Sequence, residues 1–162
     1  MDSVWAPWRM EYIEKEKEDE CIFCVLPQAQ DDEKNYILYR GPLCFVIMNT
    51  FPYNNGHLMV TPYRHLNCLT LLTKEESAEM GQLIRKCIER LKKLYSPDGF
   101  NTGTNLGKAG GAGFDQHLHT HIVPRWIGDT NFMPVLAETK VHPQHLRAGY
   151  EKLAPLFNEQ TL

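Results

Sequence analysis

The chain has 162 residues, of which 43% are hydrophobic and 23% are charged, and its formal net charge is −3 at pH 7. These values are typical of one globular domain, and they argue against a nucleic-acid surface, which would usually show as a basic stripe. No apolar run approaches the roughly 20 residues that a membrane helix needs. The N-terminal segment lacks the basic-then-apolar pattern of a secretory signal. We therefore expect a cytoplasmic protein whose partner is a small molecule.

Residues 1–20 combine an aromatic stretch, with Trp5 and Trp8, and a run of alternating Glu and Lys. This composition predicts an N-terminal extension that packs on the body of the domain or on a second subunit. We predict a single domain over residues 21–162.

Five cysteines, an odd number, point to a metal or free thiols rather than to a disulfide framework. Cys21 and Cys24 have the C-x-x-C spacing that both structural zinc sites and redox motifs use. A thioredoxin-like motif would follow a strand and open a helix, whereas this pair follows the charged run 14–20, so a metal is favoured. The remaining cysteines have apolar neighbours and are predicted to be core thiols: Cys44, Cys68 and Cys87.

Four β-rich segments precede the most distinctive part of the chain. Residues 36–39 and 43–48 predict a hairpin, because Arg40-Gly41-Pro42 separates them. A turn-rich loop then leads into a third strand over 57–62, and residues 100–106 predict a fourth.

A long helix is predicted over residues 74–95. Thr73 and Glu76 have the spacing of a capping box at its start, and Ser96-Pro97-Asp98-Gly99 ends it. Apolar residues recur at helical spacing on one face: Met80, Leu83, Ile84, Cys87, Ile88 and Leu91. A C-terminal helix is expected from about Pro143, with a second apolar stripe: Leu146, Tyr150, Leu153 and Leu156.

Three histidines alternate with other residues from His117 through His119 to His121. The alternation predicts a fifth strand in which the three imidazoles share one face. His117 and His121 would be roughly 13 Å apart in a straight strand, which is too far for one metal ion held by all three. We therefore expect one end of the row to be structural and its middle to be chemical. The alternative is a polar row on a solvated sheet face.

A glycine-rich loop, residues 107–113, precedes this row and holds four glycines in seven residues. A backbone without Cβ atoms can approach a ligand closely and turn its N–H groups toward phosphate oxygens. The loop alone is a weak signal, but its position before the histidines suggests phosphate chemistry.

The H-x-H-x-H row followed by apolar residues resembles the signature of the histidine triad family of nucleotide hydrolases and nucleotidyl transferases. Residues 105–134 and the opening Trp5–Met10 are most similar to the branch that includes diadenosine tetraphosphate phosphorylases. The resemblance spans residues 5 to about 143. It implies an α+β fold with about five strands in a mainly antiparallel sheet, one long helix over about 74–95, a C-terminal helix, and a homodimer or higher homo-oligomer.

The resemblance also implies roles for individual residues. His119 would attack the α-phosphorus and form an adenylyl-histidine, while His57 and His121 would hold the non-bridging oxygens. Asn105 and N–H groups of the glycine loop would steady charge, and Asn49 would meet the ribose. The expected catalytic residues are therefore His119, His121, His57 and Asn105, and the expected nucleotide-binding residues are Asn49, Gly111, Ala112 and Gly113.

Some bacterial members of the family hold zinc at matching positions, which here are Cys21, Cys24, His65 and His117. The resemblance thus implies a structural Zn²⁺ in a closed tetrahedral site, with no organic cofactor. The alternative is a pair of free thiols and a metal-free His117.

The expected activity is phosphorolysis of diadenosine tetraphosphate to ATP and ADP. A hydrolase of dinucleoside polyphosphates or nucleoside phosphoramidates would have the same residues around the nucleophile. Two further alternatives are a zinc-stabilised nucleotide-binding protein without turnover and a metallohydrolase whose histidine row holds a catalytic ion. Trp126 and Asn131 match the phosphorylase-like branch and are expected to border the phosphate or second-nucleotide pocket.

Overall fold

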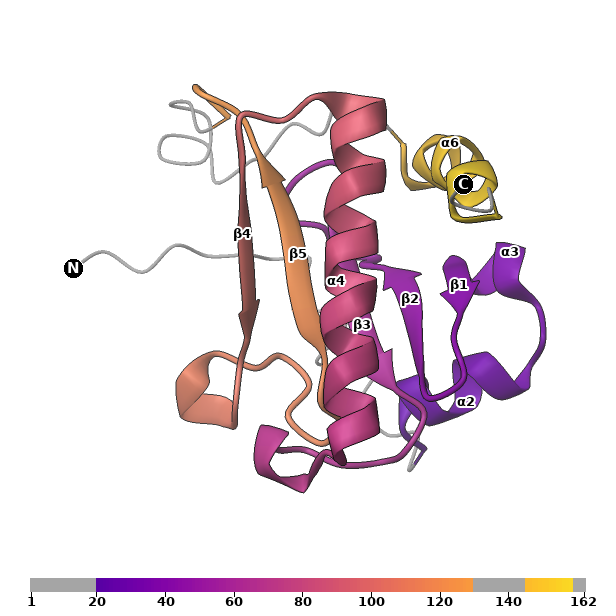
Figure 1. Ribbon diagram of the computed structural model, residues 1–162, viewed down its shortest axis with the longest axis vertical. Helices are drawn as coiled ribbons and strands as arrows, with labels where there is room; N and C mark the ends of the chain where they lie inside the picture. The colour runs from indigo at the N-terminus through magenta and orange to yellow at the C-terminus, as the bar shows by residue number, and fades with distance from the viewer. Residues whose placement is uncertain (1–19, 130–144, 159–162) are drawn as a thin grey trace.

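The computed structural model describes residues 20–129 and 145–158 (Figure 1). The predicted N-terminal extension, apart from Glu20, lies outside the described residues. So do Asn131 and the predicted start of the C-terminal helix at Pro143.

A five-stranded antiparallel sheet forms the centre of the fold, with strand order β1-β2-β3-β5-β4. This confirms the predicted α+β architecture. The strands are β1 (Ile37–Arg40), β2 (Cys44–Met48), β3 (Leu58–Pro62), β4 (Gly99–Thr104) and β5 (Thr120–Arg125). Since β5 lies between β3 and β4, His121 is paired with Met59 on one side and with Gly103 on the other.

The fifth strand is shorter than predicted, because it begins at Thr120 and not at His117. The backbone of Leu118 finds its partners outside the ladder. Its N–H donates to the carbonyl of Leu66 at 2.6 Å, and its carbonyl accepts from the Thr61 hydroxyl at 2.8 Å. Of the three histidines, only His121 therefore lies on a strand.

Helix α4 (Lys74–Tyr95) has the predicted bounds and lies across one face of the sheet (Figure 1). The Thr73 side chain accepts from the Glu76 N–H and the Glu76 carboxylate accepts from the Thr73 N–H, which confirms the capping box. Helix α6 (Leu146–Asn158) covers the same face beside β1. The predicted stripe of α4 packs in this main core, whose members from the strands include Cys44, Val46, Met48, Leu58, Val60 and Ile122.

The opposite face carries a smaller core around α2 (Ile22–Gln28), which is followed by α3 (Asp32–Asn35). Alternate residues of the strands point to this side: Phe45, Ile47 and Met59 pack with Phe23 and Ile37. Neither short helix was expected from the sequence, since α2 has only seven residues and contains Pro27. One small helix covers little of a sheet face, which leaves room for a cavity beside it.

The cysteine predictions hold for two of the three core thiols. Cys44 and Cys87 are fully buried. The prediction for Cys68 is wrong, because this residue is half-buried before the 3₁₀ turn η1 (Leu69–Leu71), where its Sγ accepts from the Thr70 hydroxyl at 3.1 Å. In the part of the chain that the structure describes, no helix is both long and apolar enough to span a membrane.

Candidate active site

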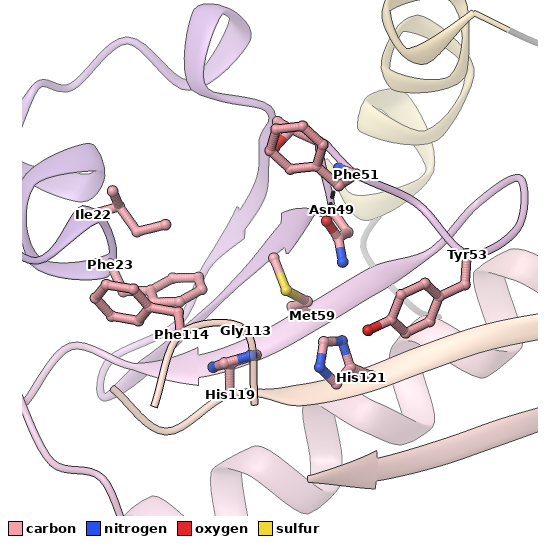
Figure 2. Close-up of a pocket in the computed structure, with 11 residues that line it drawn as sticks. Ile22, Phe23, Asn49, Phe51, Tyr53, Met59, Gly113, Phe114, His119 and His121 are labelled. Atoms are coloured by element: carbon pink, nitrogen blue, oxygen red, sulfur yellow. Dashed lines mark hydrogen bonds between the residues drawn. The ribbon is translucent and has the colours of Figure 1, made fainter. Parts of the chain in front are cut away.

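A cavity opens on the face of the sheet that carries α2, with about 660 Å³ of empty space when the part open to solvent is counted. Figure 2 shows Phe23 and Phe114 on one side, Asn49, Phe51 and Tyr53 on the other, and His119 and His121 below Met59. The lining is thus largely aromatic and apolar, with a few polar groups among it.

The protonation of His119 follows from one hydrogen bond. Its Nδ1 lies 2.8 Å from the carbonyl oxygen of His117. A carbonyl oxygen only accepts, so Nδ1 carries the hydrogen and Nε2 of the neutral ring keeps its lone pair. The side chain is 6% exposed, and this burial lowers the pKa of His119, which favours the neutral ring. An imidazole in this state is a nucleophile.

His57 and His121 form a second hydrogen-bonded unit beside it. The backbone N–H of Tyr53 donates to His57 Nδ1 at 3.0 Å, so in a neutral ring the hydrogen of His57 is on Nε2. That Nε2 lies 2.9 Å from His121 Nδ1, which must accept. The hydrogen of a neutral His121 is therefore on its Nε2, which makes this nitrogen a donor for an anionic ligand.

His57 itself lies behind His121 and not in the cavity. It is 1% exposed and is absent from the cavity lining, whereas His121 lines the cavity. The predicted direct contact between His57 and phosphate oxygens therefore does not fit this geometry. In this arrangement the His57 ring contacts the ring of His121, which lines the cavity.

Asn49 follows β2 and lines the cavity, where a ribose contact is expected. Its Oδ1 accepts the backbone N–H of Phe51 at 2.9 Å, the bond drawn in Figure 2. The amide nitrogen lies 3.4 Å from His57 Nδ1. Asn49 thus links Phe51, which lines the cavity, to the hydrogen-bonded pair of His57 and His121, here called the histidine pair.

The glycine loop contributes less to the cavity than predicted. Gly113 lines it, but Gly111, Ala112 and Asn105 do not. The Asn105 side chain donates to the carbonyl of Gly111 at 3.2 Å, and Gly111 has φ +83°, where a side chain would be strained. Asn105 therefore stabilises the glycine loop at Gly111, the residue that follows the short 3₁₀ turn η2 (Lys108–Gly110).

The structure brings together all four predicted metal ligands, Cys21, Cys24, His65 and His117. One ligand atom from each lies within 4.8 Å of all the others. The Nδ1 atom of His117 is 3.2 Å from Sγ of Cys21 and 3.6 Å from Sγ of Cys24. The Nδ1 atom of His65 is 3.4 Å from Sγ of Cys24. Tetrahedral zinc with bonds of about 2.3 Å to sulfur and about 2.05 Å to nitrogen requires S···N separations of about 3.6 Å. The donor set and its spacing therefore fit Zn²⁺.

The second nitrogen of His117 supports the same reading. Nε2 donates to the carbonyl of Pro62 at 2.9 Å, which leaves Nδ1 unprotonated toward the cysteines. Burial lowers the pKa of His117 to about 4, so the ring is neutral, as a ligand must be.

Sequence reasoning missed most of the apolar lining. Ile22 and Phe23 lie between the two cysteines, and Phe51 and Tyr53 follow Asn49 by two and four residues. Their closeness to predicted site residues was the available signal. Met59 and Phe114 gave no local signal, since their role depends on which sheet face they occupy.

Comparisons with known proteins agree with this fold. A family model described as the HIT domain matches residues 30–126. The AP-4-A phosphorylase of Mycobacterium tuberculosis is 41% identical over 169 aligned residues, which cover 99% of this chain and 86% of that protein. A crystal structure of a zinc-bound histidine triad family protein from Mycobacterium smegmatis matches the fold with a TM-score of 0.68 and 24% identity, covering 85% and 93% of the two chains. A hypothetical histidine triad nucleotide-binding protein from Sulfolobus tokodaii matches with a TM-score of 0.66 and 25% identity, covering 85% and 89%.

The antiparallel α+β fold, with His119 and His121 lining a cavity on one sheet face, is the arrangement to which these comparisons point. This chain belongs to the histidine triad (HIT) family.

Proposed function

We propose that this protein is a nucleotidyl transferase that splits diadenosine tetraphosphate with inorganic phosphate to give ATP and ADP. Its similarity along nearly the whole chain to an AP-4-A phosphorylase supports this substrate. The observation that carries the chemistry is the hydrogen bond from His119 Nδ1 to the His117 carbonyl, because it leaves Nε2 as the nucleophile.

The reaction would proceed in two displacements. His119 Nε2 attacks the α-phosphorus of one adenylate half, a P–N bond forms, and the bond to the bridging oxygen breaks so that ATP leaves. An oxygen of inorganic phosphate then attacks the same phosphorus, and the P–N bond breaks. The adenylyl group is thereby transferred to phosphate, and the product ADP leaves. His119 returns to its starting state.

The other cavity residues have roles that suit these steps. The Nε2–H of His121 would donate to a non-bridging oxygen, where negative charge accumulates as phosphorus is attacked. The apolar wall of Ile22, Phe23 and Phe51 would enclose the adenine ring, and Asn49 would bind the ribose. Gly113 would bring the glycine-loop backbone close to the polyphosphate.

The four-residue metal cluster would hold a structural Zn²⁺ through Cys21, Cys24, His65 and His117. When bound, this ion would crosslink the start of α2 to the segment before β5. The chain's own contribution there is a neutral His117, oriented by its Nε2 bond to Pro62.

The test is to incubate the protein with diadenosine tetraphosphate, with and without phosphate, and to separate the nucleotides. We expect ATP and ADP only when phosphate is present, and no turnover by His119→Ala. AMP and ATP formed in the absence of phosphate would instead identify a hydrolase. Failure of the unmutated protein to turn over this substrate in either buffer would contradict both, and nucleoside phosphoramidates would be tested next.

The single domain over residues 21–162, the homo-oligomer and the cytoplasmic location are also part of the proposal. Sedimentation equilibrium of the full chain would give the number of subunits. A monomer at micromolar concentration would contradict the oligomer.

A further inference from the structure

An ion pair closes the loop that follows β5. Arg125, the last residue of β5, donates to Asp129 through Nε at 2.6 Å and through a terminal nitrogen at 2.8 Å. Asp129 Oδ2 also accepts the backbone N–H of Trp126 at 3.2 Å. The bonds from Arg125 hold the pKa of the Asp129 carboxyl well below its usual range, so this group is an anion at neutral pH. Its side chain is only 9% exposed, in a pair that the proposed reaction does not use.

Asn54 joins this pair to the loop between β2 and β3. The residue is 8% exposed, and its amide nitrogen donates to Asp129 Oδ2 at 2.7 Å and to the carbonyl of Pro124 at 3.0 Å. One buried side chain therefore connects two segments that are 70 residues apart in the sequence. We call Asn54, Arg125 and Asp129 the clasp.

The clasp lies directly beside the residues that orient the histidine pair. Tyr53 precedes Asn54, and its backbone N–H is the donor to His57 Nδ1. The backbone N–H of His57 in turn donates to the carbonyl of Asn54 at 3.2 Å. The Tyr53 N–H and the Asn54 carbonyl thus both bind His57, one at the ring and one at the backbone. Holding the Asn54 side chain in place therefore holds this N–H and this carbonyl in place.

We propose that the clasp is a positioning device for the reactive histidines. It keeps the Tyr53 N–H against His57 Nδ1, and this contact keeps the hydrogen of His57 on Nε2. His121 then accepts at Nδ1 and donates from Nε2. The inference rests on the proposed function for its catalytic consequence, but the arrangement of hydrogens is a property of the unliganded protein.

The consequence for catalysis follows from the charge of the substrate. If His57 lost its backbone donor at 3.0 Å, the contact of its Nδ1 with the Asn49 amide nitrogen, at 3.4 Å, would hold the hydrogen on Nε2 less firmly. The hydrogen could then move to Nδ1, and His121 could carry its own hydrogen on Nδ1. Nε2 of His121 would present a lone pair to an anionic phosphate, which is repulsive where a donor is stabilising. The loss should appear in the chemical step more than in nucleotide binding, because the apolar wall is unchanged.

Long-range proton–nitrogen NMR correlation spectra of the histidine rings test the inference directly. In the unmutated, unliganded protein we expect both His57 and His121 to be Nε2–H tautomers. In Asn54→Ala we expect both to show mixed tautomers, with kcat reduced about 10- to 100-fold and KM changed less than about threefold. A protonated Nδ1 on His57 in the unmutated protein would overturn the inference without any variant.

Two further variants separate positioning from stability. Asn101→Ala removes a further hydrogen bond of Arg125, 2.6 Å long and made to an exposed side chain, and leaves the clasp intact. It should keep the wild-type tautomers and kcat. Asp129→Asn keeps the size of the side chain but removes its charge, and should shift both readouts in the direction of Asn54→Ala even if that variant folds poorly. Wild-type tautomers and kcat in a folded Asn54→Ala would overturn the inference, whereas absence of wild-type turnover would overturn only the proposed function.

Discussion

The ring of Phe23 stacks on the ring of His119, with centroids 5.0 Å apart and planes inclined by 28°. Phe23 lies on α2 between Cys21 and Cys24, so the same short segment supplies two of the candidate metal ligands and covers one face of the His119 ring. The candidate metal site and the proposed reaction centre therefore both contact Phe23.

Phe23→Leu should lower kcat about tenfold, because His119 loses a planar support and water reaches its ring. The substitution removes a buried aromatic ring, so a stability control is needed. Phe45→Leu is matched to it: Phe45 belongs to the same small core but stacks on Tyr63, 5.1 Å away, and not on a histidine. We expect similar losses of unfolding free energy in denaturant titrations, with kcat retained only in Phe45→Leu. Equal kcat in the two variants would refute the role of the stack.

Removal of the metal should destabilise the protein. We expect about one equivalent of zinc per chain in the purified protein, and a Tm lower by about 10 °C or more after chelation, since the ion crosslinks distant segments. Cys24→Ser should lose the zinc, whereas Cys68→Ser, outside the cluster, should retain it. Metal analysis and differential scanning calorimetry measure both effects. Full stability of a zinc-free protein would contradict the structural assignment.

The stability of the fold should depend on pH through Glu76. Hydrogen bonds from Arg64, at 2.9 and 2.7 Å, and from the Thr73 N–H lower its pKa from 4.5 to about 2. Because the folded-state pKa is depressed, the stabilisation is complete above pH 4.5 and is lost as the pH falls toward 2.

Glu76→Gln should therefore be less stable than the unmutated protein by about 1–2 kcal/mol at pH 7, with a difference that shrinks below pH 4.5. Urea unfolding at several pH values measures it. The control is Glu75→Gln, an exposed residue in the same helical turn, which should cost only a few tenths of a kcal/mol. A pH-independent difference for Glu76→Gln would argue against an ionic contribution.

Gly56→Ala should destabilise the fold by about 2 kcal/mol or more. Gly56 has φ +72°, and an added Cβ would lie 2.9 Å from a methyl carbon of Leu91 in the main core. Gly99→Ala is the control, because nothing lies within 4 Å of its added Cβ and its φ is not in the left-handed region. Thermal unfolding should separate the two variants, and equal Tm values would show that the turn before His57 tolerates a side chain.

Elements with local signals could be predicted from the amino-acid sequence. The capping box and apolar stripe predicted α4 at its observed bounds, and alternating β-rich runs predicted the strands. The H-x-H-x-H row and the cysteine spacing predicted which residues form the candidate site, because residue type and short spacing are properties of the chain alone. A seven-residue helix such as α2 is too short for periodicity to show.

The relative positions of these residues and their hydrogen-bond partners depend on tertiary contacts. The hydrogen on His57 depends on the Tyr53 N–H, and the position of that N–H depends on contacts with a segment 70 residues away. Likewise, His57 lies behind His121 because β3 pairs with β5, and Phe23 reaches His119 because α2 packs on one sheet face. Hydrogen-bond partners and the choice between two nitrogens of a ring arise from contacts between distant segments, and no local pattern encodes them.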